Sequence, residues 1–220
     1  MLTFHDGGLT LIPGFLVPIA ALPLVYWMIR RKADRRWTLF ALLAVVHVTL
    51  VIALTIFPIP IAGQDFYRQW RGLSEDNIVP FATIWSQLAT IWSQIGEINR
   101  GVVLSSWEPA FGALRQLSGN MLLLVPLGIY APELWPALRD WRKFLLVAIA
   151  FGVGIELTQY AGSLLEGFTY RVTDVDDAIM NASGAVIAFL LWPMVRDSPL
   201  GALIAAEVEA RYPEPGGKPT

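Results

Sequence analysis

Hydrophobic residues in this chain gather into long runs that contain few charged residues. A helix needs about 20 mostly apolar residues to cross the hydrocarbon core of a bilayer, which is ~30 Å thick. Five runs approach or reach this length, and they are Leu9–Ile29, Trp37–Phe57, Leu117–Leu134, Phe144–Leu165 and Ala178–Val195. The first run contains three prolines, which membrane helices tolerate but which bend them. The pattern predicts an all-α fold, a polytopic transmembrane helix bundle with about five spans.

The composition agrees with this pattern and excludes several classes of protein. Hydrophobic residues make up 55% of the chain and charged residues 15%, whereas soluble domains carry roughly 45–50% and about 25%. The chain has no cysteine, which excludes a disulfide scaffold, a cysteine-type zinc finger and a thiol enzyme. Its net charge of −2 provides no basic field for nucleic acid, so we expect no nucleic-acid partner.

Lysine and arginine predict the orientation of the spans, because they are enriched in short loops on the inner side of a membrane. With the N-terminus outside, eleven of the sixteen basic residues fall inside, and the dense clusters are in the loops 30–36 and 135–143. We therefore expect the N-terminus outside and the C-terminus in the cytoplasm.

The chain then divides into four segments. Residues 1–57 hold two N-terminal transmembrane helices, and residues 58–116 form a long outer loop with an amphipathic helix. Residues 117–195 form a three-helix core. Residues 196–220 form a cytoplasmic tail whose Pro- and Gly-rich end is expected to be disordered.

The amphipathic helix is predicted by a tandem repeat in the outer loop. Ala82–Gln87 recurs as Ala89–Gln94 with a period of seven, which keeps equivalent residues on nearly one helix face. The resulting apolar stripe contains Ile84, Trp85, Leu88, Ile91, Trp92 and Ile95, with the serines and glutamines on the other side. Tryptophan favours the membrane–water interface, so residues 81–98 are predicted to form an interfacial helix. A helix that only packs against the spans is an open alternative.

Several polar side chains lie inside the predicted spans, where an unpaired ionisable group costs several kcal/mol. Glu156 and Gln159 share one face of the fourth span, because residues three apart lie side by side on a helix. Asp177 and Asn181 share a face of the fifth span, and Asn120 lies near the start of the third. The predicted orientation places all of them in the outer half of the bundle. The candidate binding residues are therefore Asn120, Glu156, Gln159, Arg171, Asp174, Asp177 and Asn181.

Structural roles are open alternatives for most of these residues. Asp174 as N-cap would place Asp177 at the third helical position, where both meet the positive end of the helix dipole. Glu156 and Asn181 are also suited to a structural hydrogen bond between helices. Arg171 is either a solvated rim charge or the counter-ion of one of the acids.

Three residues within spans are assigned structural roles instead. His47, alone in the middle of the second span, is expected to be packed and hydrogen-bonded rather than catalytic. Pro126 and Gly128 are expected to mark a kink and a point of close helix contact.

The order and spacing of the polar residues resemble the VanZ-like family over roughly residues 77–190. The motifs are Asn77-x-x-Pro80-Phe81, Gly119-Asn120-x5-Pro126-Leu127-Gly128, Glu156-x-x-Gln159 and Arg171-x-x-Asp174-x-Asp176-Asp177-x3-Asn181-x2-Gly184. The resemblance implies a small, multi-pass protein of the bacterial cytoplasmic membrane. The founding member is associated with resistance to the glycopeptide antibiotic teicoplanin, and the family name carries no agreed biochemical activity.

The polar cluster predicts binding of an amphiphile of the outer leaflet, either a lipid-linked cell-wall precursor or a lipoglycopeptide. One alternative is a membrane-embedded enzyme acting on a lipid-linked substrate, in which Glu156 is the general base and Asp177 the second acid. A divalent cation held by Asp174, Asp176 and Asp177 would belong to that alternative. A proton-coupled transporter is the other alternative. No other cofactor is expected, and the lipid bilayer is the expected partner.

Overall fold

The computed structural model describes residues 2–5, 8–11, 35–56, 59–62, 76–100, 107–166, 169 and 171–198. Within this part of the chain, four helical segments are long and apolar enough to cross a membrane. They are Thr38–Thr55, Glu108–Leu134, Trp141–Leu165 and Val175–Met194. The predicted helical bundle is therefore confirmed. The end of the predicted tail, beyond residue 198, lies outside the described residues.

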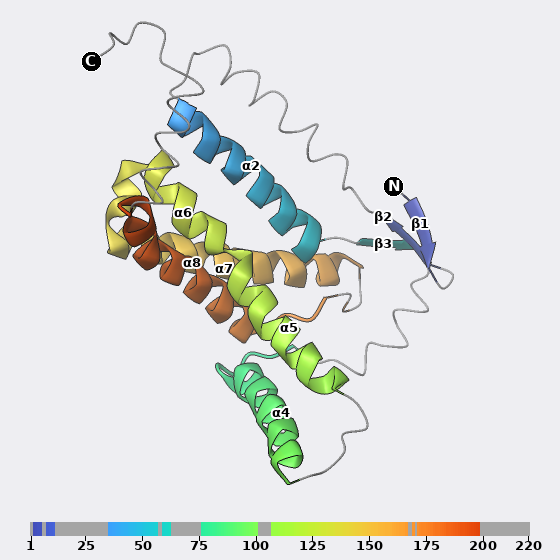
Figure 1. The fold of residues 1–220 in the computed structure, drawn as a ribbon. Helices are drawn as coiled ribbons and strands as arrows, with labels where there is room; N and C mark the ends of the chain where they lie inside the picture. Colours follow the sequence, from blue (N-terminus) through green and yellow to red (C-terminus); the bar gives the residue numbers. More distant parts are fainter. Residues whose placement is uncertain are drawn as a thin grey trace, which may run out of the picture.

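Beside the bundle lies a small antiparallel sheet that the sequence did not predict (Figure 1). Strand β1 (Leu2–His5) pairs with β2 (Gly8–Leu11), and β2 pairs with β3 (Ile59–Ala62). The start of the predicted first span at Leu9 is therefore wrong. Residues 9–11 take their backbone hydrogen bonds from neighbouring strands, and the rest of that run lies outside the described residues.

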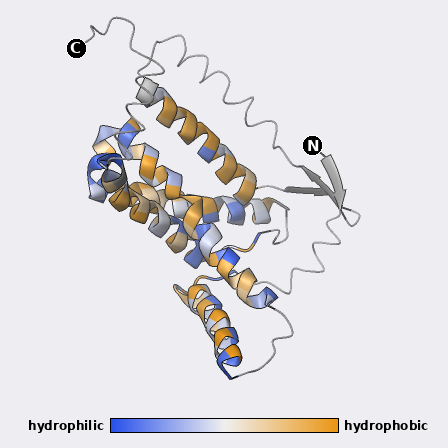
Figure 2. Cartoon of the chain, viewed as in Figure 1, coloured by the Kyte–Doolittle hydropathy of each residue, from blue (hydrophilic) through white to orange (hydrophobic). Residues whose placement is uncertain are grey.

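The spanning helices lie together in one bundle (Figure 1). Helix α2 (Arg35–Thr55) packs against α6 (Val125–Leu134), and α6 packs against α8 (Val175–Arg196). Helix α7 (Trp141–Glu166) covers another side of α8 and follows the short helix η1 (Pro136–Arg139). Hydrophobic residues cover nearly the whole length of α2 (Figure 2).

The third predicted span starts earlier than Leu117 and is broken. Helix α5 (Glu108–Leu123) begins with an acidic residue and a proline in its first turn, and both favour a helix start. The break lies at Leu124, ahead of α6, because Pro126 has no N–H to continue the helix. Gly128 follows the break and lies against the backbone of α8 at Ala185, so the predicted kink and close contact are confirmed.

His47 from α2 hydrogen-bonds to the break between α5 and α6. Its Nε2 lies 2.7 Å from the Leu123 carbonyl oxygen, and its Nδ1 lies 3.1 Å from the Tyr130 hydroxyl. A carbonyl only accepts, so Nε2 carries the proton and Nδ1 of the neutral ring accepts from Tyr130. The Leu127 N–H bonds to Leu124 instead of Leu123, so the imidazole replaces a donor that the break removes. The expected packed and hydrogen-bonded role of His47 is confirmed.

Replacing His47 by phenylalanine is expected to destabilise the bundle. The change leaves the Leu123 carbonyl and the Tyr130 hydroxyl without their partner, and an unsatisfied buried polar group costs about 1–3 kcal/mol. The measurement is the thermal unfolding midpoint in detergent for H47F, Y130F and the double variant. Strictly additive effects of the two single changes would contradict the direct contact.

Helix α4 (Ala82–Asn99) confirms the helix predicted by the tandem repeat. It lies beyond the N-terminal end of α8 and packs mainly along α5 (Figure 1). Its position makes it one wall of the polar end of the bundle, which contains the candidate site.

Candidate functional site

The chain segments ahead of α4 and α8 pair with each other at this end of the bundle. The Asn77 N–H donates to the Thr173 carbonyl at 2.9 Å, and the Val175 N–H donates to the Asn77 carbonyl at 3.0 Å. The Asn77 side chain donates to the Asp174 carboxylate at 2.8 Å. We call Asn77, Asp174 and Asp176 the clasp, because together they join two segments that are far apart in the sequence.

Asp174 is the N-cap of α8, which is one of the two roles that the sequence left open. Its Oδ1 accepts from the Asp176 N–H at 2.9 Å, which satisfies one of the free donors in the first helical turn. The same oxygen accepts from Asn77, so the cap and the clasp share one carboxylate oxygen.

Asp176 caps a different helix, and this role was not predicted. Its side chain is 1% exposed, and its two oxygens accept from the backbone N–H groups of Phe81 and Ile84 at the start of α4. Phe81 precedes α4 with a φ of 69°, in the left-handed region that bulky residues rarely adopt. No side chain of the N-cap residue itself bonds to the first turn of α4. Asp176 therefore supplies the cap from α8.

Glu156 and Gln159 contact backbone groups of neighbouring segments. Glu156 is 6% exposed, and its Oε2 accepts from the Asp174 N–H at 2.9 Å. Gln159 is also buried and donates to the Thr55 carbonyl at the end of α2 at 2.9 Å. Gly152, one turn before Glu156, brings α7 close to α8: a Cβ added to it would lie 2.7 Å from the Ala178 carbonyl oxygen of α8.

Arg171 and Asn181 lie in surroundings that the sequence did not specify. The Arg171 guanidinium donates to the Leu54 carbonyl at 3.2 Å, so it helps to hold the end of α2. Asn181 is 1% exposed, and its Oδ1 has no hydrogen-bond partner among the residues that the structure describes. Glu156 bonds to the Asp174 N–H, and no Glu156–Asn181 hydrogen bond is seen in this part of the chain.

An open groove of about 550 Å³ lies beside this cluster, between α4 and α5. Its lining combines small residues with three amides and one arginine: Gln87, Pro109, Gly112, Ala113, Arg115, Gln116, Gly119 and Asn120. The Gln87 amide donates to Gln116 across the groove at 3.0 Å. Asn120 lines the groove and also donates to the Asp177 carboxylate. Asn120 is therefore the predicted residue that lines the groove, and its side chain connects the groove to Asp177.

Sequence reasoning missed Gln87, Arg115 and Gln116 as groove residues. They lie on segments that the hydropathy pattern assigned to the outer loop, and the earlier start of α5 is what brings Arg115 and Gln116 onto a helix. The acidic first turn and proline at the start of α5 were the signals that could have found them.

The acids at the start of α8 are engaged in hydrogen bonds within the protein. Within the described ranges, no group of three or more histidine or acidic side chains is placed to hold a metal ion. The Asp176 oxygens accept from two N–H groups of α4, and Asp174 Oδ1 accepts from Asn77 and from Asp176.

The comparisons with known proteins agree with the helices and the polar residues. The family model described as VanZ/LLP1 matches residues 40–196, which include most of α2 as well as the segments that carry the motifs. No curated protein and no solved structure matches the chain. The family match and the spanning helices together identify the chain as a multi-pass membrane protein that belongs to the VanZ/LLP1 family.

Proposed function

We propose that this protein binds an amphiphile of the outer leaflet at the end of the bundle formed by α4, α5 and the start of α8. The amphiphile is a lipid-linked cell-wall precursor or a lipoglycopeptide. The observation that carries the proposal is the position of Asn120, which lines the open groove and also donates to the Asp177 carboxylate. A binding site needs concavity, apolar walls and a few polar groups that fix orientation.

The groove suits the polar head of such a molecule. Three side-chain amides and the Arg115 guanidinium offer donors and acceptors to sugar, peptide or phosphate groups. The α5 side of the groove carries the small residues Gly112, Ala113 and Gly119. Because their side chains occupy little space, a bulky polar head fits against the helix. Glu156, Asp174 and Asp176 are hydrogen-bonded within the protein. We therefore propose that these acids fix the positions of the helices around the groove and do not contact the ligand.

The location of the groove on the outer side rests on the basic residues. Arg139, Arg142 and Lys143 lie between α6 and the first turn of α7, and Arg196 lies at the end of α8, so all four are at the opposite end of the bundle from the clasp. Basic residues favour the cytoplasmic side. We therefore place the groove outside and the C-terminus inside, in the cytoplasmic membrane.

The proposal predicts that filling the groove weakens ligand binding strongly without unfolding the protein. A Cβ added at Gly112 or Gly119 meets nothing within 4 Å, so phenylalanine at either position extends into open space. We expect G112F and G119F in nanodiscs to bind teicoplanin and a lipid-linked disaccharide-pentapeptide at least tenfold more weakly, measured by calorimetry.

The matched control is Gly154→Phe on α7, where an added Cβ also meets nothing within 4 Å and which does not line the groove. G154F is expected to bind like the unchanged protein. Unchanged affinity in both groove variants, or no affinity for either probe in the unchanged protein, would overturn the proposal.

A further inference from the structure

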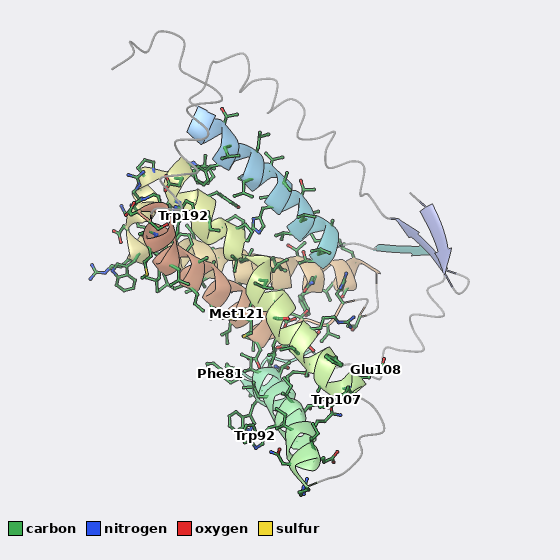
Figure 3. The ribbon with its side chains drawn as sticks, viewed as in Figure 1. Phe81, Trp92, Trp107, Glu108, Met121 and Trp192 are labelled. Atoms are coloured by element: carbon green, nitrogen blue, oxygen red, sulfur yellow. The ribbon has the colours of Figure 1, made fainter. Side chains whose placement is uncertain are left out.

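One side of α4 exposes large apolar side chains that no other part of the described structure covers. Trp85 and Trp92 are 74% and 75% exposed, and Leu88 and Ile95 are exposed beside them. Phe81, just ahead of the helix, is exposed as well. Figure 3 shows Phe81 and Trp92 on the side of α4 that faces away from α5. We call Trp85, Leu88, Trp92 and Ile95 the tryptophan face.

The apolar stripe predicted from the repeat is therefore divided between two surfaces. Ile84 and Ile91 are half-buried, together with Gln87 and Gln94, on the side of α4 that packs along α5. Ser86 and Ser93 are exposed on the remaining side. Packing against α5 thus accounts for the isoleucines and glutamines but leaves the tryptophan face without a partner.

The chemistry of the tryptophan face matches the surface of a lipid bilayer. Tryptophan is enriched at the interface because its ring is apolar and its N–H is polar. Trp85 and Trp92 are seven residues apart on one face, about 10 Å along the helix, so both rings reach the interface when the helix rests on the membrane surface. Helix α5 continues the apolar surface, since Phe111, Leu114 and Leu122 are exposed along it.

The attraction of α4 to the bilayer surface does not depend on charged residues. The helix Ala82–Asn99 contains Glu97 but no lysine or arginine, whereas most surface-binding helices carry basic residues on their polar face. Apart from Glu97, its polar residues are serine, threonine, glutamine and asparagine, which are neutral. Contact with the membrane would therefore depend on the apolar area and the indole rings and would vary little with lipid charge.

We propose that α4 rests on the outer surface of the bilayer with its tryptophan face in the lipid headgroup layer. Asp176 holds the start of α4 against the first turn of α8, so the helix meets the membrane at a fixed point. The opposite side of α4 forms a wall of the groove. The contact is a lipid surface, and it is independent of the amphiphile that the groove binds.

The absence of cysteine allows a direct test with single spin labels. Leu88→Cys and Ile95→Cys report on the tryptophan face, and Ser86→Cys and Ser93→Cys are matched controls on the exposed polar side. In nanodiscs, we expect the labels at positions 88 and 95 to be at least threefold more accessible to oxygen than to a water-soluble nickel chelate. We expect the ratio to invert at positions 86 and 93.

The same pattern is expected in zwitterionic lipid and in lipid with a fifth of anionic phosphatidylglycerol. Equal nickel accessibility at all four positions would overturn the proposal, because the tryptophan face would then lie in water. Dipolar broadening between labels at position 88 on two molecules would also overturn it, because a second copy would then cover the face. Either result leaves the groove variants G112F and G119F as a separate test.

Discussion

Replacing Gly184 by alanine is expected to destabilise the protein more than any other single methyl group added to a glycine of the bundle. A Cβ at this position would overlap the Met121 carbonyl oxygen of α5, which is a backbone atom. A side chain could rotate away, but a backbone carbonyl moves only with its helix. Overpacking of this kind costs about 1–3 kcal/mol and occasionally more. The measurement is the thermal unfolding midpoint of the detergent-solubilised protein.

A matched control separates this packing effect from any general effect of changing a helical glycine. Gly154→Ala on α7 adds the same methyl group where nothing lies within 4 Å. Alanine forms helix better than glycine by about 1 kcal/mol, so G154A is expected to be neutral or slightly stabilising. Equal destabilisation by G184A and G154A would show that α5 and α8 do not approach each other as closely as described.

The close approach at Gly184 also shows what could be predicted from the sequence. A small residue on a polar stripe of a membrane helix indicates a helix contact, because small residues let backbones approach. The stripe of Asp177, Asn181 and Gly184 does face α5, through the Asn120–Asp177 hydrogen bond and the Met121 carbonyl. The sequence could not identify Met121 as the contact, because Gly184 meets its backbone carbonyl, and every residue type has that group.

Most of the polar site could not be predicted for the same reason. The sequence placed Glu156, Gln159 and Asp177 at one end of the bundle correctly, because helix direction and spacing are sequence properties. Their partners were not predictable, because Glu156 and Gln159 bond to backbone groups at Asp174 and Thr55. Backbone donors and acceptors are the same at every residue except proline, so only the fold selects among them.

The ends of helices were predicted less well than their middles. Hydropathy located the centres of α2, α7 and α8, because about 20 apolar residues are a strong signal. It missed the first turns of α5, where Arg115 and Gln116 interrupt the apolar run. A helix that extends beyond the hydrocarbon core carries polar residues at that end, so hydropathy alone truncates it.

Replacing Asp176 by alanine is expected to release α4 from the bundle and to lower stability. The carboxylate accepts from the N–H groups of Phe81 and Ile84, and loss of a helix cap or of a buried acceptor costs about 1–3 kcal/mol. Phe81 would also lose the contact that helps to hold its left-handed backbone. The measurements are the unfolding midpoint and the mobility of a spin label at Ser93→Cys in α4.

A graded series distinguishes this cap from a general effect of charge at the start of α8. Asp176→Asn keeps one acceptor oxygen and removes the negative charge. We therefore expect D176N to lose about half as much stability as D176A. If the charge mattered only through the dipole of α8, D176N and D176A would be equally destabilised. In that case the label at position 93 would stay as immobile as in the unchanged protein, because α4 would not depend on Asp176. An intermediate midpoint for D176N, together with a more mobile label in D176A, is the result that assigns Asp176 to α4.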